Sequence, residues 1–125
     1  MENKWKNKNF KDSVKNAFNG IMYILQNERN FRIQIIAALL VIIASFVLRL
    51  ELIEFAIIVL VIFLVWLLEF INSAIEIVID MYTEEYNKKA KVAKDISAGA
   101  VTLTALMSVI IGIIIFLPKI LKYIK

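Results

Sequence analysis

Five polar residues lie at helical spacing in the second half of a long apolar segment, residues 52–81. They are Glu69, Asn72, Ser73, Glu76 and Asp80, and we call them the acidic stripe. At about 100° and 1.5 Å per residue, Asn72 borders a face that the other four share within roughly 60° and over about 16 Å. Carboxylates at membrane depth are costly unless they meet a cavity or a partner, and three together favour a bound cation. The stripe therefore predicts a functional site, although an amphipathic extension outside the lipid is the simpler alternative.

Composition restricts the chemistry of that site. The 125 residues are 61% hydrophobic with a mean hydropathy of +0.76, which predicts one integral membrane unit spanning residues 1–125. Cysteine and histidine are absent. Acid–base catalysis would therefore use carboxylates or lysine, and a metal would be a hard cation such as Mg²⁺ or Ca²⁺ held by oxygen atoms. The net charge of +4 is small and the basic residues flank apolar segments, so nucleic acid is not implied as a partner.

Helical periodicity predicts an all-α protein with one surface helix and three spans. Residues 10–26 carry apolar residues at steps of three and four opposite a polar face, which is typical of an amphipathic helix at the membrane interface or against its own bundle. The spans are expected at about 30–49, 52–81 and 95–117. Gln34 and Ser45 are the only polar residues of the apolar run 33–48 within the first span.

The connections follow from the same pattern. A tight reversal is expected around Arg49 to Ile53, and a solvated polar connection from Tyr82 to Asp95. Pro118 is expected to close the third span. Asp95 could cap the beginning of that helix instead of binding a ligand.

The distribution of basic residues predicts a cytoplasmic N-terminus. Lysines and arginines before the first span and in the polar connection outnumber those at the other ends, eleven to four. The eleven are Lys4, Lys6, Lys8, Lys11, Lys15, Arg29, Arg32, Lys88, Lys89, Lys91 and Lys94; the four are Arg49, Lys119, Lys122 and Lys125. The acidic stripe then lies at the cytoplasmic surface, where ATP is available.

Three sequence runs together resemble the prokaryotic diacylglycerol kinase family. Residues 69–80 read Glu-Phe-Ile-Asn-Ser-Ala-Ile-Glu-Ile-Val-Ile-Asp, similar to that family's E-x-x-N-[ST]-A-I-E-x-x-x-D signature. The run Ala-Lys-Asp-Ile-Ser-Ala-Gly-Ala follows at residues 93–100, and Asn-Glu-Arg-Asn-Phe-Arg stands at residues 27–32. The resemblance covers nearly all of residues 10–118. Walker and glycine-rich kinase loops are absent from the sequence, so a nucleotide site needs another design.

The resemblance implies a homotrimer of three-span subunits in the bacterial plasma membrane, with active sites shared between neighbours and facing the cytoplasm. It implies transfer of the γ-phosphoryl of Mg-ATP to a lipid hydroxyl, with Glu69 as general base and Glu28 and Glu76 as ligands of Mg²⁺. The positions matching the nucleotide site are Asn72, Asp80, Glu85, Tyr86, Asn87, Lys94 and Asp95. Those matching the lipid site are Phe31, Arg32, Glu69 and Ala98.

The chemistry of phosphoryl transfer agrees with these positions, because it asks mainly for positioning and charge neutralisation. Glu69 lies about 10 Å deeper along the helix than Glu76, so it can meet a lipid hydroxyl while Glu76 meets the nucleotide. Without the resemblance, Glu28 would be interpreted as an interfacial charge and Lys94 as an orientation signal. Arg49 and Glu54 are expected to be charges of the external loop. Trp66 and Trp5 are expected to serve packing or interfacial anchoring.

Two substrates and two other protein classes compete. The short form of the chain resembles the Gram-positive branch of the family, which implies undecaprenol as substrate; the alternative is diacylglycerol, giving phosphatidic acid. A small oligomeric cation channel or carrier would also use buried carboxylates, but residues 55–68 and 106–117 are nearly continuous apolar sequence without a polar path. A membrane anchor or scaffold would leave the acidic stripe unexplained.

Overall fold

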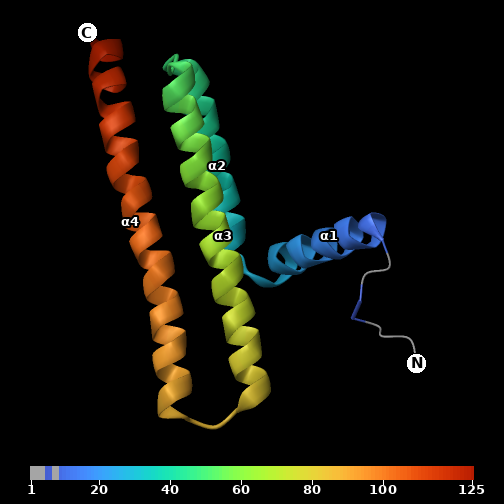
Figure 1. Ribbon diagram of the computed structural model, residues 1–125. Coiled ribbons are helices and arrows are strands. Elements are labelled where there is room, and N and C mark those ends of the chain that lie inside the picture. The colour runs from blue at the N-terminus through green and yellow to red at the C-terminus, as the bar shows by residue number, and fades with distance from the viewer. Residues whose placement is uncertain (1–4, 7–8) are drawn as a thin grey trace.

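The computed structural model describes residues 5–6 and 9–125. The described residues form four α-helices, α1 (Phe10–Asn27), α2 (Arg29–Val47), α3 (Leu52–Tyr82) and α4 (Lys88–Ile124), which confirms the all-helical prediction. Helices α2, α3 and α4 run side by side, and α1 leaves them at a steep angle (Figure 1). Lys4 and Lys8, two of the basic residues behind the predicted orientation, lie outside the described residues.

Helix α1 begins and ends at defined caps. Asn9 is its N-cap, and its Oδ1 accepts a hydrogen bond of 2.9 Å from the Asp12 amide. Glu28 adopts an extended conformation, so α1 ends there and α2 starts in a new direction. Arg32 stabilises this bend, because its Nη1 donates to the carbonyls of Leu25 at 2.8 Å and Gln26 at 3.0 Å. Carbonyls in the last turn of a helix have no amide donor within that helix, so the guanidinium supplies one.

The reversal between α2 and α3 is a Schellman motif built around Arg49. Arg49 has a positive φ of 54°, its amide bonds to the Phe46 carbonyl at 3.2 Å, and the Leu50 amide bonds to the Ser45 carbonyl at 3.0 Å. Helix α3 then starts with a reciprocal capping box between Glu51 and Glu54. Glu54 is therefore more than an external charge, since its Oε1 also lies 3.1 Å from Lys119 Nζ of α4.

The beginning of α4 corrects two predictions. The polar connection is confined to residues 83–87, and Asn87 caps α4 by accepting a 3.1 Å hydrogen bond from the Ala90 amide. Asp95 is therefore not an N-cap but lies in the third turn of the helix, where it pairs with Lys91 at 2.8 Å. The predicted connection was too long because residues 88–93 contain Lys and Ala, which favour helix, and neither Gly nor Pro.

The end of α4 corrects a third prediction, because Pro118 lies inside the helix. Proline removes one amide donor, but the residues beyond it still extend the hydrogen-bond pattern; the Lys125 amide bonds to the Leu121 carbonyl at 3.3 Å. Lys119 also ties this part of α4 to Glu54 of α3. The helix thus continues to Ile124.

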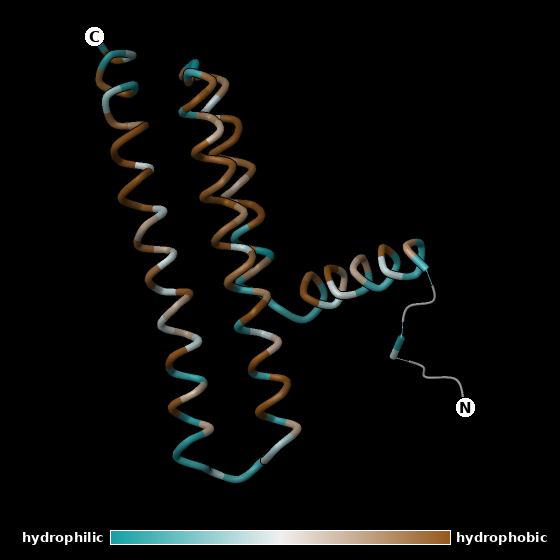
Figure 2. The backbone as a smooth tube through the Cα atoms, in the orientation of Figure 1, coloured by the Kyte–Doolittle hydropathy of each residue, from teal (hydrophilic) through white to brown (hydrophobic). Residues whose placement is uncertain are grey.

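Three of the helices described are long and apolar enough to cross a membrane: α2 with 19 residues, α3 with 31 and α4 with 37. At about 1.5 Å per residue, α3 and α4 exceed a hydrocarbon core of about 30 Å. Figure 2 shows hydrophobic residues along the bundle and hydrophilic ones gathered at the α3–α4 connection. The packing of α3 against α4 is the most extensive in the bundle. Both helices therefore carry a polar extension at the same end.

Candidate active site

The acidic stripe runs from a buried to an exposed environment along α3. Glu69 is only 4% exposed and Ser73 only 2% exposed. Asn72 and Glu76 are half-buried, and Asp80 is exposed. A buried carboxylate and a half-buried carboxylate therefore stand on one helix, two turns apart, as a deep and a shallow part of the same site.

Helix α2 contributes a residue that the sequence analysis missed. Gln34 Nε2 lies 3.5 Å from Glu69 Oε2, and Gln34 Oε1 is buried without a hydrogen-bond partner among the described residues. Gln34 was noted only as a polar residue in an apolar run. That position was itself the available signal, because an amide at membrane depth needs a polar partner.

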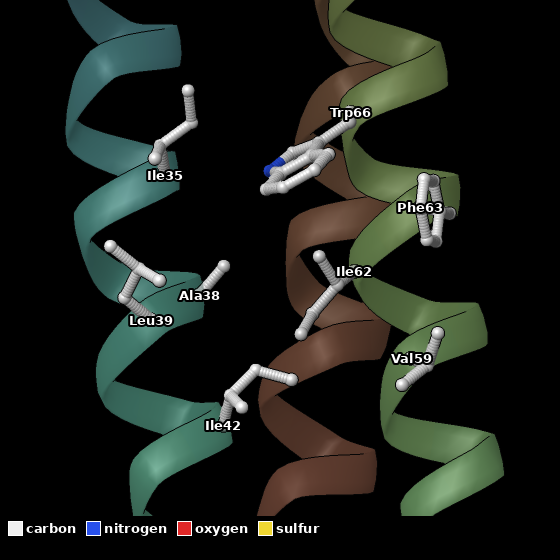
Figure 3. Close-up of a pocket in the computed structure, with 8 residues that line it drawn as sticks. All are labelled: Ile35, Ala38, Leu39, Ile42, Val59, Ile62, Phe63 and Trp66. Carbon is white, nitrogen blue, oxygen red and sulfur yellow. The ribbon is translucent and has the colours of Figure 1, made fainter.

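Aromatic packing holds α2 against α3 around Glu69. Phe31 is 3% exposed, and its ring meets Trp66 and Phe70 edge-on at centroid distances of 5.6 and 5.1 Å. Trp66 serves packing, as expected. It also borders an apolar pocket of about 160 Å³ between the two helices, where Ala38 and Ile42 of α2 point toward α3 (Figure 3).

Helix α4 contacts the stripe from the other side. Ser97 Oγ donates to Asn72 Oδ1 at 2.7 Å, and Asn72 Nδ2 lies 3.5 Å from Glu76 Oε1. Lys94 Nζ pairs with Asp80 Oδ1 at 2.8 Å, and it is close enough to Glu76 for their charges to interact. The two helices thus place a cation and a hydroxyl beside three members of the acidic stripe.

A polar cavity of about 510 Å³ opens beside the α3–α4 connection. Five of the seven residues predicted to bind the nucleotide line it: Asp80, Glu85, Tyr86, Asn87 and Lys94. The other two do not line it: Asn72 is two turns deeper on α3, and Asp95 lies one turn beyond Lys91, a residue of the cavity wall with which it pairs. The structure therefore gathers residues from two helices and their connection around one space next to the stripe.

The remaining predicted residues come from the α1–α2 junction and from α4. Glu28 is half-buried at the bend, and its charge acts on Glu69, as does the charge of Glu76. Arg32 is exposed, and its guanidinium is engaged by carbonyls at the end of α1. Ala98 is exposed on α4. Within one chain, the charge of Glu28 thus acts on the deepest member of the acidic stripe, whereas no contact between Ala98 and the stripe is found among the described residues.

The oxygen donors fit a sparsely ligated magnesium ion. Among the residues described, no three acidic side chains stand close enough together to enclose a metal ion. Mg²⁺ does not need such a cage, because it keeps several waters and takes one or two carboxylates together with substrate phosphates. Glu28 and Glu76 offer carboxylates of that kind, and both are near enough to Glu69 for their charges to act on it.

Fold and site define a membrane-spanning helical protein with a carboxylate-rich polar site at one end of its bundle. The family model for prokaryotic diacylglycerol kinase matches residues 15–116, and the chain belongs to this family. It is therefore an enzyme, a lipid kinase of the membrane. This confirms the resemblance seen in the sequence, and it does not favour a channel, a carrier or a scaffold.

Individual relatives support the same assignment. Undecaprenol kinase of Bacillus subtilis is 44% identical over 113 residues, which are 90% of this chain and 91% of the relative. Diacylglycerol kinase of Synechocystis is 40% identical over 88% of this chain and 63% of its own length. Diacylglycerol kinase of Escherichia coli K12 is 31% identical over 75% of this chain and 77% of its own.

Proposed function

We propose that this chain transfers the γ-phosphoryl group of Mg-ATP to the hydroxyl of undecaprenol and forms undecaprenyl phosphate. One observation supports this reaction: the acidic stripe leads from a water-accessible polar cavity to a buried carboxylate. The similarity to an undecaprenol kinase along almost the whole of both chains supports this lipid. Diacylglycerol is the alternative substrate, because two of the relatives are diacylglycerol kinases.

The proposed reaction uses the depth of the stripe to bring its two substrates together. The lipid hydroxyl oxygen attacks the γ-phosphorus, the bond from that phosphorus to the β-γ bridging oxygen breaks, and ADP leaves. Glu69 accepts the hydroxyl proton, because its buried carboxylate sits at the level where a lipid head can reach it. Gln34 holds the Glu69 carboxylate from α2. The polar cavity, about 10 Å toward the surface, receives the nucleotide.

Charge neutralisation in this proposal comes from Lys94 and a metal ion. Lys94 acts as a point charge on the phosphates. Its exposed ion pair with Asp80 is weak enough to be exchanged for phosphate. Glu28 and Glu76 would hold Mg²⁺, which when bound neutralises phosphate oxygens. Asn72, Glu85, Tyr86, Asn87 and Asp95 are proposed to complete the nucleotide site, and Phe31, Arg32 and Ala98 the lipid site.

The same proposal includes location and assembly. We place the N-terminus and the site on the cytoplasmic side of the bacterial plasma membrane, because basic residues gather at that end of the bundle. Phe10, Val14 and Phe18 of α1 are exposed and suit a helix lying in the interface. A homotrimer with shared sites would let a neighbouring subunit cover residues such as Ala98. Residues 1–125 then act as a single domain.

The decisive experiment is a lipid phosphorylation assay with purified protein in vesicles containing Mg-ATP. Undecaprenol and diacylglycerol are offered separately at matched mole fractions, and phosphorylated lipid is measured. We expect a higher kcat/KM for undecaprenol than for diacylglycerol. The Glu69→Gln protein serves as the matched inactive control. Preference for diacylglycerol would replace the proposed substrate, and phosphorylation of neither lipid by folded protein would refute the reaction. Cation flux through the same vesicles would support the channel alternative.

A further inference from the structure

Ser97 of α4 is a buried polar residue whose hydroxyl leaves its own helix. It is 6% exposed, and its Oγ donates to Asn72 Oδ1 of α3 at 2.7 Å. Other Ser and Thr hydroxyls of α4 bond to a carbonyl three or four residues back in the same helix, as Thr102 does to Ala98 at 3.0 Å and Thr104 to Ala100 at 2.7 Å. That local bond is available to a helical serine at no cost in interhelical geometry. The hydroxyl of Ser97 therefore serves a contact between helices.

This contact anchors the oxygen end of the Asn72 amide. An amide has an acceptor oxygen on one side and donor hydrogens on the other. With Oδ1 accepting from Ser97, Nδ2 faces Glu76 Oε1 at 3.5 Å. The flipped amide would set its oxygen against the carboxylate of Glu76, where two acceptors repel each other. Glu76, whose carboxylate can only accept, thus selects this orientation, and the Ser97 hydroxyl anchors the amide from its other end.

The Asn72 amide in turn restrains the Glu76 carboxylate. Asn72 and Glu76 are separated by one helical turn and share a face of α3. Glu76 also lies near the like charge of Glu69, which repels its carboxylate, and near the positive charge of Lys94, which attracts it. A directional hydrogen bond from a fixed amide holds the carboxylate in one rotamer against these forces.

We propose that Ser97 is a positioning residue which acts through Asn72 to hold the Glu76 carboxylate ready for the metal–nucleotide complex. The inference rests on the proposed function, in which Glu76 is a metal ligand. A residue needed only for packing would stabilise the fold without changing metal affinity. A positioning residue changes metal affinity in a folded protein, and its effect disappears when Asn72 is removed.

The test measures divalent-metal binding without turnover. Mn²⁺ binding is followed by electron paramagnetic resonance in detergent-solubilised protein with a non-hydrolysable ATP analogue. Ser97→Ala is expected to weaken Mn²⁺ binding roughly threefold to tenfold, the worth of one hydrogen bond. Ser97→Thr retains a hydroxyl and should restore binding to within about twofold of wild type. Ser45→Ala is the matched control, because Ser45 is also buried but donates only to the Val41 carbonyl of its own helix.

A double-mutant cycle separates positioning from packing. In an Asn72→Ala background, Ser97→Ala should cause no further loss of Mn²⁺ affinity. An equal loss in both backgrounds would overturn the proposal, as would wild-type affinity in Ser97→Ala. If Ser97→Ala does not fold, Ser97→Cys replaces it, because the thiol is similar in size but a weak donor and should weaken Mn²⁺ binding in the same way. Failure of the proposed function is distinguishable, because wild-type protein would then show no binding with the analogue and no lipid phosphorylation.

Discussion

Gln34 of α2 meets Glu69 of α3 through a long hydrogen bond of 3.5 Å from its amide nitrogen to the carboxylate oxygen. Glu69 is nearly buried, and its bond to Gln34 is to a neutral group. The surrounding charges that act on it, from Glu28 and Glu76, are of like sign. Gln34 thus restrains the Glu69 carboxylate without supplying an opposite charge.

Replacement of Glu69 by Gln should abolish most turnover and spare nucleotide binding. The amide fills the same volume but cannot accept the hydroxyl proton, and positioned general bases contribute roughly a hundredfold or more to rate. kcat with undecaprenol and binding of a fluorescent ATP analogue would be measured together. A near-normal kcat would refute the assignment of Glu69 as general base.

Gln34→Leu should lower kcat roughly threefold to tenfold, because Glu69 loses one hydrogen bond that fixes its rotamer. The apolar residue removes the amide but keeps similar bulk in the first span. Gln34→Asn shortens the amide and serves as the comparison for reach. If Gln34→Leu and wild type had the same kcat, Gln34 would have no role in positioning Glu69.

Glu76→Gln should weaken the use of Mg-ATP. An amide oxygen is a poorer ligand for a hard cation than a carboxylate, so the apparent KM for Mg²⁺ should rise much more than the KM for lipid. Initial rates over a magnesium titration at saturating lipid would check this. Equal increases in both KM values would instead indicate a general distortion of α3.

Hydrophobic length and periodicity were sufficient to predict the helices, but not all of their ends. The apolar runs predict three spans because a bilayer requires that length, whatever the rest of the molecule does. The beginning of α4 depended on whether Asn87 or Asp95 supplied the cap, and both residue types can do so. Pro118 suggested a stop, yet one missing donor did not end a helix that is tied to α3 by Lys119.

The acidic stripe was predictable because residues on one helix share a face by spacing alone. Its partners on other helices were not predictable, because Gln34 and Ser97 contact the acidic stripe only through the relative register of α2, α3 and α4. The resemblance assigned Phe31 a place in the lipid site, and in the structure its ring packs between Trp66 and Phe70. Packing of that kind depends on the assembled fold and has no signature in spacing.

The buried ring of Phe31 leads to a prediction about stability. Phe31→Ala should lower the free energy of unfolding by about 3 kcal/mol, because it leaves a cavity in the aromatic cluster beside Glu69. Phe31→Leu should recover most of that loss. Denaturation in mixed micelles would give both values, and the KM for undecaprenol of the Leu variant would test the proposed lipid contact. An unchanged stability in Phe31→Ala would contradict the packing role.

The ion pair between Glu54 and Lys119 should stabilise the bundle without affecting catalysis. It joins α3 to α4 at the end of the bundle opposite the polar cavity, and both side chains are 24% exposed. Lys119→Met should therefore lower the midpoint of thermal unfolding while kcat and both KM values stay at wild-type levels.

Lys122→Met, on the exposed last turn of α4, is the control for loss of a positive charge at that end. High salt should narrow the difference between wild type and Lys119→Met, because screening weakens a partly exposed pair. A loss of kcat in folded Lys119→Met would mean that the two ends of α3 are coupled, and that the register set by this pair reaches the acidic stripe.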